Sequence, residues 1–425
     1  MDIFLNPSRQ QWAALCRRAE QDNSQIAARV DEIIEMVARE GDAALVALAR
    51  KIDGVELSAL KVSEAEFCEA ENKVSEDVKA AIEVAISNIT KFHAAQLPHE
   101  VSVETQSGVR CIQRPVAIQK VGLYIPGGTA PLFSTVLMLA LPAKIAGCRE
   151  VVLCSPTNKQ GKTAAEVLYA AKRCGVTSVY KVGGAQAVAA MAYGTESIPK
   201  VNKIFGPGNR YVMLAKQRVS ACNTAIDMPA GPSEVMVLAD ESARAEFVAA
   251  DLLSQAEHGR DSQAIVVCNS VALAEAVVAE VKRQAAQLSR GEYIYESLEH
   301  SRAVVFDERE QMIDFANEYA AEHLIVSMQN EWDVVDKITA AGSIFVGNYS
   351  PESAGDYASG TNHTLPTSSW AHSCSGVNID SFMRKMTIQE LSHDGLQGLA
   401  ETIVTMANAE GLEAHAAAVT VRMKN

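Results

Sequence analysis

The chain has 425 residues, of which 48% are hydrophobic and 5% are aromatic, and its formal net charge is −14 at pH 7. This length allows two or three globular units, each with a hydrophobic core of its own. The acidic balance excludes a nucleic-acid-binding protein of the usual kind, because such proteins need a basic surface.

The remaining bulk features predict a cytoplasmic protein without a membrane segment. The most apolar stretch, residues 130–147, is interrupted by Pro142 and Lys144, and its apolar part falls short of the roughly 20 residues that a spanning helix needs. The first residues show no basic segment followed by an apolar one, so we expect no secretory signal. The cysteines are scattered singly and form no CxxC pair, which predicts neither a disulfide framework nor a thiolate zinc site.

The first part of the chain predicts helices and then strands. Apolar residues recur at steps of three and four over residues 24–52 and 75–96, as in amphipathic helices. Residues 102–128 predict short strands that turn at Gly108.

Two series of alternating strands and helices follow. The first has strands over 150–156, 178–184, 203–208 and 233–240, with helices over 162–175, 185–194 and 209–220. The second has helices over 244–259, 271–288 and 309–320, with strands over 262–269, 302–307, 323–328 and 342–347. Such alternation predicts parallel sheets with crossover helices, and therefore an α/β fold with two Rossmann-like units.

The amino-acid composition changes after these two series. Residues 348–376 are rich in Gly, Ser, Pro, Thr and Asn, and a loop this long in a compact protein is either disordered or functional. From residue 381 onward the pattern predicts a strand followed by helices, which are free to reach a partner subunit.

Polar side chains suited to a metal or to proton transfer stand in distant segments. Gln255 and His258 lie three residues apart on one face of a predicted helix that ends at Gly259. Glu322 and His323 stand where a helix gives way to a strand, and they form a candidate base or water-activating pair. Each group alone also fits a solvated helix end or cap.

The long loop adds Asp356 and His363, and the tail adds Glu410 and His415. Together these segments supply imidazole, carboxylate and amide ligands, which suit one first-row metal. Because the chain has no HExxH motif, residue spacing by itself does not assign a zinc site.

Glycine-rich turns occupy residues 125–133, 182–190 and 205–212. Each sits where a strand hands over to a helix, so backbone N–H groups and the helix dipole favour a nucleotide phosphate over a plain tight turn. None is a complete GxGxxG motif, since Tyr211 occupies the place of the third glycine. The irregular connection 226–235 brings Asp227 and Ser233 toward the same edge.

Six stretches, in order and over nearly the whole chain, resemble the histidinol dehydrogenase family. They are "GLYIPGGTAPLFSTVLMLALPAKIAGC", "VGGAQAVAAMAYGTESIPKVNKIFGPGN", "IDMPAGPSEV", "DLLSQAEHG", "AEHLI" and "SPESAGDYASGTNHTLPT". The resemblance implies a homodimer with two incomplete Rossmann-like domains, parallel sheets, and N- and C-terminal helical extensions that pack on the partner subunit. The implied parts are an N-terminal helical arm (1–22), a first domain with the metal and catalytic residues (23–123 with 235–376), a second domain with the NAD contacts (124–234) and a C-terminal dimerisation arm that contributes to the partner's active site (377–425).

The resemblance also implies a zinc- and NAD-dependent enzyme of histidine biosynthesis, with one zinc per subunit. It oxidises L-histidinol to L-histidine through L-histidinaldehyde, with two NAD and one water. The implied metal ligands are Gln255, His258, Asp356 and His415, the last from the other subunit. The implied bases are Glu322 and His323. The implied NAD contacts are Tyr124, Gln186 and Asn209. The implied substrate contacts are the metal ligands, the two bases and three further residues, Ser233, His363 and Glu410.

The chemistry of the residue types agrees with these roles. His323 would take the hydroxyl proton as hydride leaves, and Glu322 would activate the water that hydrates the aldehyde. The chain departs from the family at Ala321, which stands where the family usually has Pro.

Three alternatives stay open at this stage. A paralogue on the same scaffold would oxidise another small alcohol, such as a sulfonated diol, but retention of Glu410 and His415 favours histidinol. A zinc hydrolase would use Glu322 and a metal-bound water. Binding of NAD would distinguish the dehydrogenase from such a hydrolase. A non-catalytic binding protein is disfavoured, because buried polar groups without a use are costly.

Overall fold

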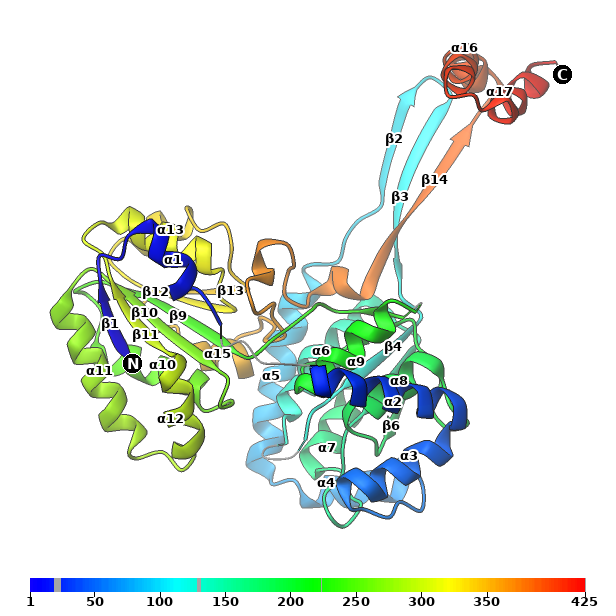
Figure 1. Cartoon of the computed structure of the whole chain (residues 1–425). Helices are drawn as coiled ribbons and strands as arrows, with labels where there is room; N and C mark the ends of the chain where they lie inside the picture. Colours follow the sequence, from blue (N-terminus) through cyan, green and yellow to red (C-terminus); the bar gives the residue numbers. More distant parts are fainter. Residues whose placement is uncertain (19–23, 128–130, 223, 425) are drawn as a thin grey trace.

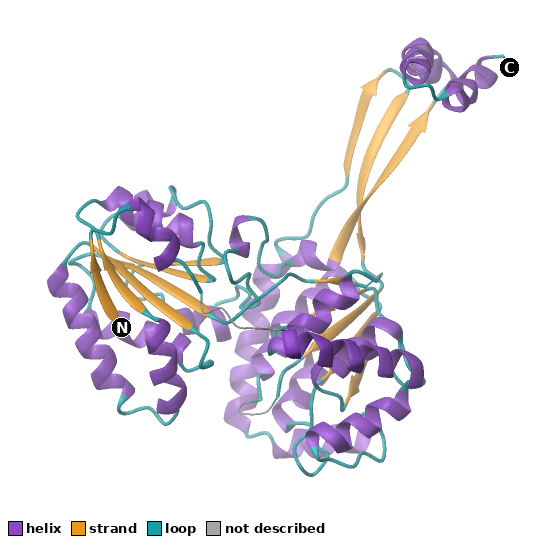
Figure 2. Cartoon of the chain, in the orientation of Figure 1, coloured by secondary structure: helices purple, strands orange, loops and turns teal. Residues whose placement is uncertain are grey.

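The computed structural model describes residues 1–18, 24–127, 131–222 and 224–424. The described chain forms two α/β lobes and an arm that projects from one of them (Figure 1). Each lobe is a parallel sheet with helices on both faces (Figure 2), so the predicted pair of α/β units is confirmed.

The first lobe is built on a six-stranded parallel sheet in the order β1-β11-β10-β9-β12-β13. Its strands are β1 (Asp2–Leu5), β9 (Glu234–Ala239), β10 (Gln263–Cys268), β11 (Arg302–Val305), β12 (His323–Ser327) and β13 (Ser343–Val346). One face is covered by α10 (Ala245–Ala256), α11 (Val271–Ala285) and α12 (Gly291–His300), and the other by α1 (Arg9–Leu15), α13 (Arg309–Tyr319) and α14 (Glu331–Val335). Every residue of β9, β10 and β12 is buried, because both faces of these strands pack against helices.

The second lobe is built on a five-stranded parallel sheet in the order β6-β5-β4-β7-β8. Its strands are β4 (Lys120–Tyr124), β5 (Glu150–Cys154), β6 (Ser178–Tyr180), β7 (Lys203–Phe205) and β8 (Ala225–Ile226). One apolar core joins the sheet to α4 (Glu64–Lys73), α5 (Glu76–Ala94), α6 (Phe133–Ala146) and α7 (Ala165–Cys174). A second core joins it to α2 (Ser24–Glu40), α3 (Asp42–Leu48), α8 (Gly184–Tyr193) and α9 (Arg210–Ser220).

The helices between residues 24 and 94 belong to this second lobe, which corrects the predicted domain that joined residues 23–123 to 235–376. Helix α2 packs on α8 and α9, α4 packs on α7, and α5 packs on α6. The physical reason lies in α6, which is buried on nearly all sides and therefore needs a further helix outside it. The early amphipathic helices supply that outer layer.

The N-terminal segment also differs from the helical arm predicted for residues 1–22. It opens with β1, which extends the first sheet by pairing with β11. Helix α1 then packs on the same sheet through Trp12, whose ring meets those of Phe306 and Phe315 edge to face. Residues 19–22 lie outside the described residues.

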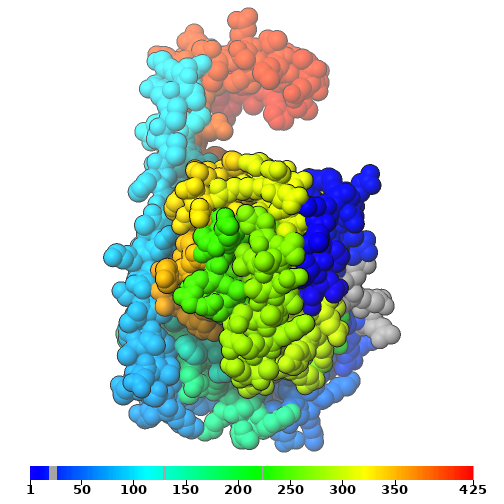
Figure 3. All heavy atoms as spheres, turned by 90° about the vertical axis from the view of Figure 1, so that its left-hand side faces the viewer, coloured from blue at the N-terminus to red at the C-terminus, as the bar shows by residue number. Residues whose placement is uncertain are grey.

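The arm is a three-stranded antiparallel sheet that carries two helices. Its strands are β2 (Val101–Gln106), β3 (Val109–Ala117) and β14 (Met383–Leu391), and its helices are α16 (His393–Ala409) and α17 (Glu413–Thr420). The two helices stand clear of the lobes in the space-filling view (Figure 3). Exposed apolar side chains of the arm include those of Val101, Val103, Met386, Leu391, Met406, Leu412 and Val421. Such a surface marks a protein contact site, and the dimerisation role of residues 377–425 stays a prediction.

Two other features concern the chain as a whole. No helix in the described ranges combines the length and the hydropathy that a membrane crossing demands. All nine cysteines lie within the described ranges, and each of them is free.

Replacing Trp12 by Ala should destabilise the first lobe strongly. The side chain is buried, packs on two phenylalanines and donates its indole N–H to the carbonyl oxygen of Pro7 at 3.0 Å. We expect a loss of about 3–5 kcal/mol in the free energy of unfolding. Urea denaturation followed by circular dichroism measures it. The control, Trp332→Ala, removes a tryptophan that is 65% exposed, and an equal loss in both variants would contradict the packing described for α1.

Candidate active site

Predicted site residues from two elements meet at the amino-terminal edge of the first sheet. His323 begins β12 and Glu322 directly precedes it, while Gln255 lies in the last turn of α10 and His258 in the turn that follows this helix. A crossover helix runs back against the strand before it, so the end of α10 returns to the edge where β9 and β12 begin. This is the edge opposite to the one at which open α/β sheets usually bind ligands.

The parallel pairing of β12 with β9 places one residue, Glu234, against the predicted bases. His323 stands opposite Val235 in the register. The backbone N–H of Glu234 donates to Glu322 Oε2 at 2.8 Å, and its carbonyl oxygen lies 3.3 Å from His323 Nδ1. Gln255 Nε2 donates to the same Glu322 oxygen at 3.2 Å. Both predicted bases are therefore buried and held by hydrogen bonds.

Burial and neighbouring charges shift the pKa values of these two groups. Burial raises the pKa of Glu322 to about 8, although the nearby His323 acts in the opposite direction. Burial alone would lower the pKa of His323, but the negative charge of Glu352 and of the other carboxylates around it raises that pKa to about 10. A carboxyl group that titrates near neutral pH beside a buried imidazole is suited to proton transfer.

The cluster contains groups that could hold a metal ion. The ligand atoms of His258, Glu352 and Asp356 all lie within 4.8 Å of one another. Glu352 and Asp356 come from the short helix α15 (Glu352–Tyr357), where a spacing of four residues puts them on one face. The amide oxygen of Gln255 is buried and has no hydrogen-bond partner in the described part of the chain. One imidazole nitrogen and several oxygens suit zinc or another first-row metal, so the residues present fit such an ion.

His363 connects this cluster to the second lobe. Its Nδ1 lies 2.8 Å from the carbonyl oxygen of Asp356, and its Nε2 lies 3.0 Å from the hydroxyl of Thr135 on α6. The carbonyl oxygen can only accept, so the ring proton is on Nδ1 and the threonine hydroxyl donates to Nε2. The predicted substrate contact His363 thus lies where the two lobes touch.

The remaining predicted substrate contacts divide into two groups. Ser233 lies one residue before Glu234 and reaches the same sheet edge. Glu410 and His415 are exposed on the arm, at the end of α16 and on α17, away from the cluster (Figure 1). The single chain therefore does not bring these last two residues to the other ligands.

A buried ion pair anchors Glu234 from its other side. The Nε and Nη2 groups of Arg18 each donate to one carboxylate oxygen of Glu234 at 2.8 Å. The other donors of the guanidinium bind the carbonyl oxygens of Cys16 and Tyr319 and the hydroxyl of Ser369. All five guanidinium N–H groups therefore donate hydrogen bonds. A buried ion pair is stable when its remaining donors are satisfied in this way.

The three predicted NAD contacts lie at the carboxyl-terminal edge of the second sheet. Tyr124 ends β4, and its hydroxyl accepts the backbone N–H of Gly184 at 3.1 Å. Gln186 is buried in the first turn of α8. Asn209 caps α9 by accepting two backbone N–H groups of its first turn. Helices that begin at such an edge offer N–H groups and a positive dipole end to a phosphate.

The turn between β7 and α9 requires a glycine. Gly206 has φ +124°, and a Cβ there would lie 2.1 Å from the carbonyl oxygen of Tyr124. Its backbone N–H donates to Asp227, and its carbonyl oxygen accepts from the Lys216 ammonium, each at 2.8 Å. Lys216 and Asp227 form a buried ion pair at 2.5 Å. The pair fixes the backbone that leads to Asn209.

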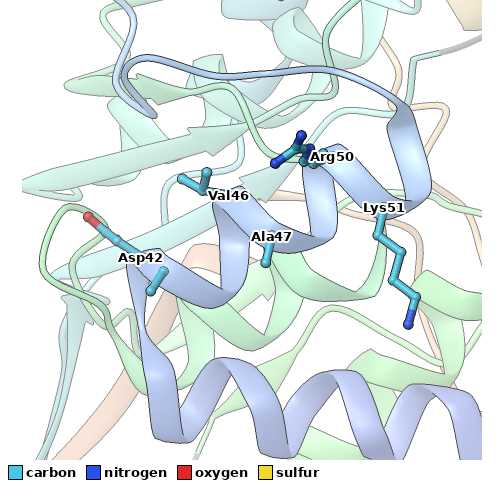
Figure 4. A pocket seen from close by; sticks show the side chains of 6 residues that line it. Asp42, Val46, Ala47, Arg50 and Lys51 are labelled. Atoms are coloured by element: carbon cyan, nitrogen blue, oxygen red, sulfur yellow. The ribbon is translucent and has the colours of Figure 1, made fainter.

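A surface hollow of the second lobe lies apart from this cluster. It is open and runs along α3, lined by Asp42, Val46, Ala47, Arg50 and Lys51 (Figure 4). It brings together no imidazole, thiol or paired carboxylate, so it offers no group for proton transfer or metal binding. We therefore take the cluster of the first lobe as the candidate active site.

Sequence reasoning missed three charged residues of this site, Arg18, Glu234 and Glu352. Arg18 and Glu234 are 216 positions apart, so no local pattern links them. Glu352 left a weak signal, because it precedes Asp356 by four residues in a segment that begins after Pro351.

Comparison with known proteins covers nearly the whole chain. The family described as histidinol dehydrogenase matches residues 16–423. A histidinol dehydrogenase of Bacteroides thetaiotaomicron is 53% identical over 423 residues, which span 100% of this chain and 99% of that protein. One of Aliivibrio fischeri is 54% identical over 417 residues, 98% of this chain and 94% of that protein. The crystal structure of a histidinol dehydrogenase from Elizabethkingia anophelis has a TM-score of 0.97 and 47% identity, and the match covers 100% of this chain and 98% of that one.

Replacing Arg18 by Met should leave the Glu234 carboxylate buried without its counter-charge. We expect the free energy of unfolding to fall by about 3–5 kcal/mol. The double variant Arg18→Met/Glu234→Met should recover part of this loss, because no charge is then left alone. Urea denaturation measures both. Arg9→Met is the control, since its pair with Glu318 is exposed at the surface, and a similar loss there would contradict a special role for the buried pair.

Proposed function

The chain belongs to the histidinol dehydrogenase family, and we propose that it oxidises L-histidinol to L-histidine through L-histidinaldehyde, with two NAD as hydride acceptors and one zinc ion per site. The observation that carries this proposal is the cluster of buried proton-transfer groups and metal-ligating atoms around His323. The carboxyl-terminal edge of the second sheet supports the assignment of NAD as cofactor. There the turn before α9 requires a glycine, Gly206, and Asn209 caps the start of that helix.

The metal would be held by the amide oxygen of Gln255, the imidazole of His258 and the carboxylate of Asp356, with His415 supplied by a second subunit. When bound, the ion supplies positive charge that fixes the amino and imidazole nitrogens of histidinol and offsets the carboxylates that raise the pKa of His323. Fixing the substrate in this way orients its alcohol carbon for reaction.

His323 takes the proton in the first oxidation. Its Nδ1 faces the carbonyl oxygen of Glu234, so the proton on that nitrogen is held in place. The Nε2 atom lies 3.4 Å from the Asp356 carboxylate and has no hydrogen-bond partner among the residues that the structure describes. As hydride passes from the alcohol carbon to NAD, the hydroxyl proton moves to His323 and the aldehyde forms.

Glu322 serves the second oxidation. It takes a proton from water as the water oxygen adds to the aldehyde carbon, which gives the hydrate. The hydrate then loses a hydride to the second NAD and a proton to the base, which yields the acid. Because burial raises the pKa of Glu322 to about 8, the carboxylate is a strong enough base for this step near neutral pH.

The protein works as a cytoplasmic homodimer in this proposal. The exposed apolar side chains of α16 and β14 support a second copy of the chain as the partner of the arm. The free cysteines fit a reducing compartment.

The experiment that tests the reaction is the yield of NADH per histidinol, with zinc-loaded enzyme, limiting histidinol and excess NAD. We expect a ratio near two, because both oxidations occur on one substrate. A ratio near one would show that the aldehyde escapes before the second step. No NADH from folded, zinc-loaded protein would overturn the substrate assignment and favour a different small alcohol.

Replacing His323 by Asn should slow the first oxidation by about 10²–10⁴-fold, because the general base is lost. The zinc content measured by atomic absorption should stay at the wild-type value, since His323 is not one of the proposed ligands. His99→Asn is the control, because that side chain is exposed in a loop. Wild-type turnover in the His323 variant would refute the base assignment, and loss of zinc would mean that the residue belongs to the metal shell.

A further inference from the structure

Ser368 and Ser369 form a strained turn that the proposed chemistry leaves without a role. Their φ angles are positive, 53° and 62°, in a region of backbone conformation that residues other than glycine rarely adopt. Strain of this kind persists only where the surrounding contacts impose it, and it is concentrated at functional sites. The turn belongs to the long loop that also carries His363, so the contacts that impose it concern the candidate active site.

The buried pair of Arg18 and Glu234 holds this turn in place. The backbone N–H of Ser368 donates to Glu234 Oε1 at 2.7 Å. The hydroxyl of Ser369 accepts from Arg18 Nη1 at 2.9 Å and donates to the carbonyl oxygen of Tyr319 at 3.2 Å. These hydrogen bonds compensate for the strained backbone and attach the turn to the start of β9.

The Arg18 guanidinium lies where four segments of the first lobe meet. Its side chain is 14% exposed, and its Cζ atom lies 3.7 Å from the centroid of the Tyr319 ring. Tyr319 donates its hydroxyl to Gln263, the first residue of β10, at 2.7 Å. One cation therefore connects the N-terminal segment, the end of α13, the start of β9 and the long loop.

The segments that Arg18 connects lead directly to the groups of the candidate active site. The backbone N–H and carbonyl oxygen of Glu234 hold Glu322 and His323. In the loop, residues 364–367 are all buried, and closely packed residues transmit a displacement. A shift of Glu234 or of the turn would therefore displace both bases and His363.

We propose that Arg18 is a positioning residue for the oxidation of the substrate. It holds the Glu234 carboxylate and the Ser368–Ser369 turn together, and through them it sets the positions of both bases and of His363. This inference rests on the proposed function and gives the N-terminal segment a role in the reaction. The role requires a guanidinium, because its planar fork donates to both carboxylate oxygens and to the Ser369 hydroxyl at once. A lysine ammonium keeps the charge but has a single nitrogen atom, so it cannot keep all of these partners.

The test compares Arg18→Lys with the wild type in steady-state kinetics, at a temperature where circular dichroism shows both proteins to be folded. Because the bases and His363 lose their positions, kcat should fall about tenfold or more and KM for histidinol should rise. KM for NAD should change by less than about twofold, since the proposed cofactor edge belongs to the second lobe. Arg9→Lys is the matched control. Its exposed pair with Glu318 joins the same segment to the same helix, and all three constants should keep their wild-type values.

The fluorescence of Trp370, the residue after the turn, reports the turn without any turnover. The chain has three tryptophans, of which Trp12 is only 4% exposed and Trp332 can be replaced by Phe. Quenching by acrylamide in that background then acts mainly on Trp370. Adding Arg18→Lys should increase the quenching, because the turn is released from Glu234.

A second variant, Ser368→Pro, covers the case in which Arg18→Lys does not fold. Proline has no N–H to donate and cannot adopt a positive φ, so it releases the turn and leaves the Arg18–Glu234 pair in place. It should produce the same changes in kcat, in KM for histidinol and in quenching. Lower stability alone, with wild-type kinetic constants and quenching in the folded variants, would overturn the proposal. A wild type that yields no NADH from histidinol would instead defeat the proposed function, and the positioning role with it.

Discussion

The parallel register between β9 and β12 is the constraint on which the site depends. It sets His323 opposite Val235, so the backbone of Glu234 can hold both Glu322 and His323. A slip of one residue would turn every side chain of β12 to the other face of the sheet and separate both groups from Glu234. The Arg18 guanidinium stabilises this register, because it binds the Glu234 carboxylate and connects it to the N-terminal segment and to the end of α13.

The proposed nucleotide and the proposed metal ion lie at opposite kinds of sheet edge in the two lobes. At the carboxyl-terminal edge of the second sheet helices begin, and their free N–H groups favour the phosphates of a nucleotide. At the amino-terminal edge of the first sheet helix α10 ends, and the free carbonyl groups there favour a cation. His363 bridges the two lobes through Thr135. The proposed hydride donor and acceptor are thus assigned to opposite kinds of sheet edge, each matched to the charge of its ligand.

Much of the fold could be predicted from local pattern, and the long-range pairings could not. The buried strands of both sheets are continuous apolar runs bounded by turn residues, so their order along the chain was evident. The amphipathic helices between residues 24 and 94 were assigned to the wrong sheet, because periodicity shows that a helix has an apolar face but not which surface covers it. Residue types and spacing named Gln255, His258 and Asp356 as candidates, and the resemblance to a family gave them the role of metal ligands, which stays a prediction. Arg18 and Glu352 had no local signal strong enough to place them beside these residues.

The claim at the centre of this account is that each active site combines the first lobe of one chain with the arm of another. Mixing two inactive variants, His323→Asn and His415→Asn, tests it most directly. In a mixed dimer one site has an intact His323 and receives an intact His415, so random mixing in equal amounts should restore about a quarter of the wild-type turnover. If the mixture stays as inactive as its separate components after subunit exchange is verified, the arm does not complete the partner's site and the shared centre is wrong.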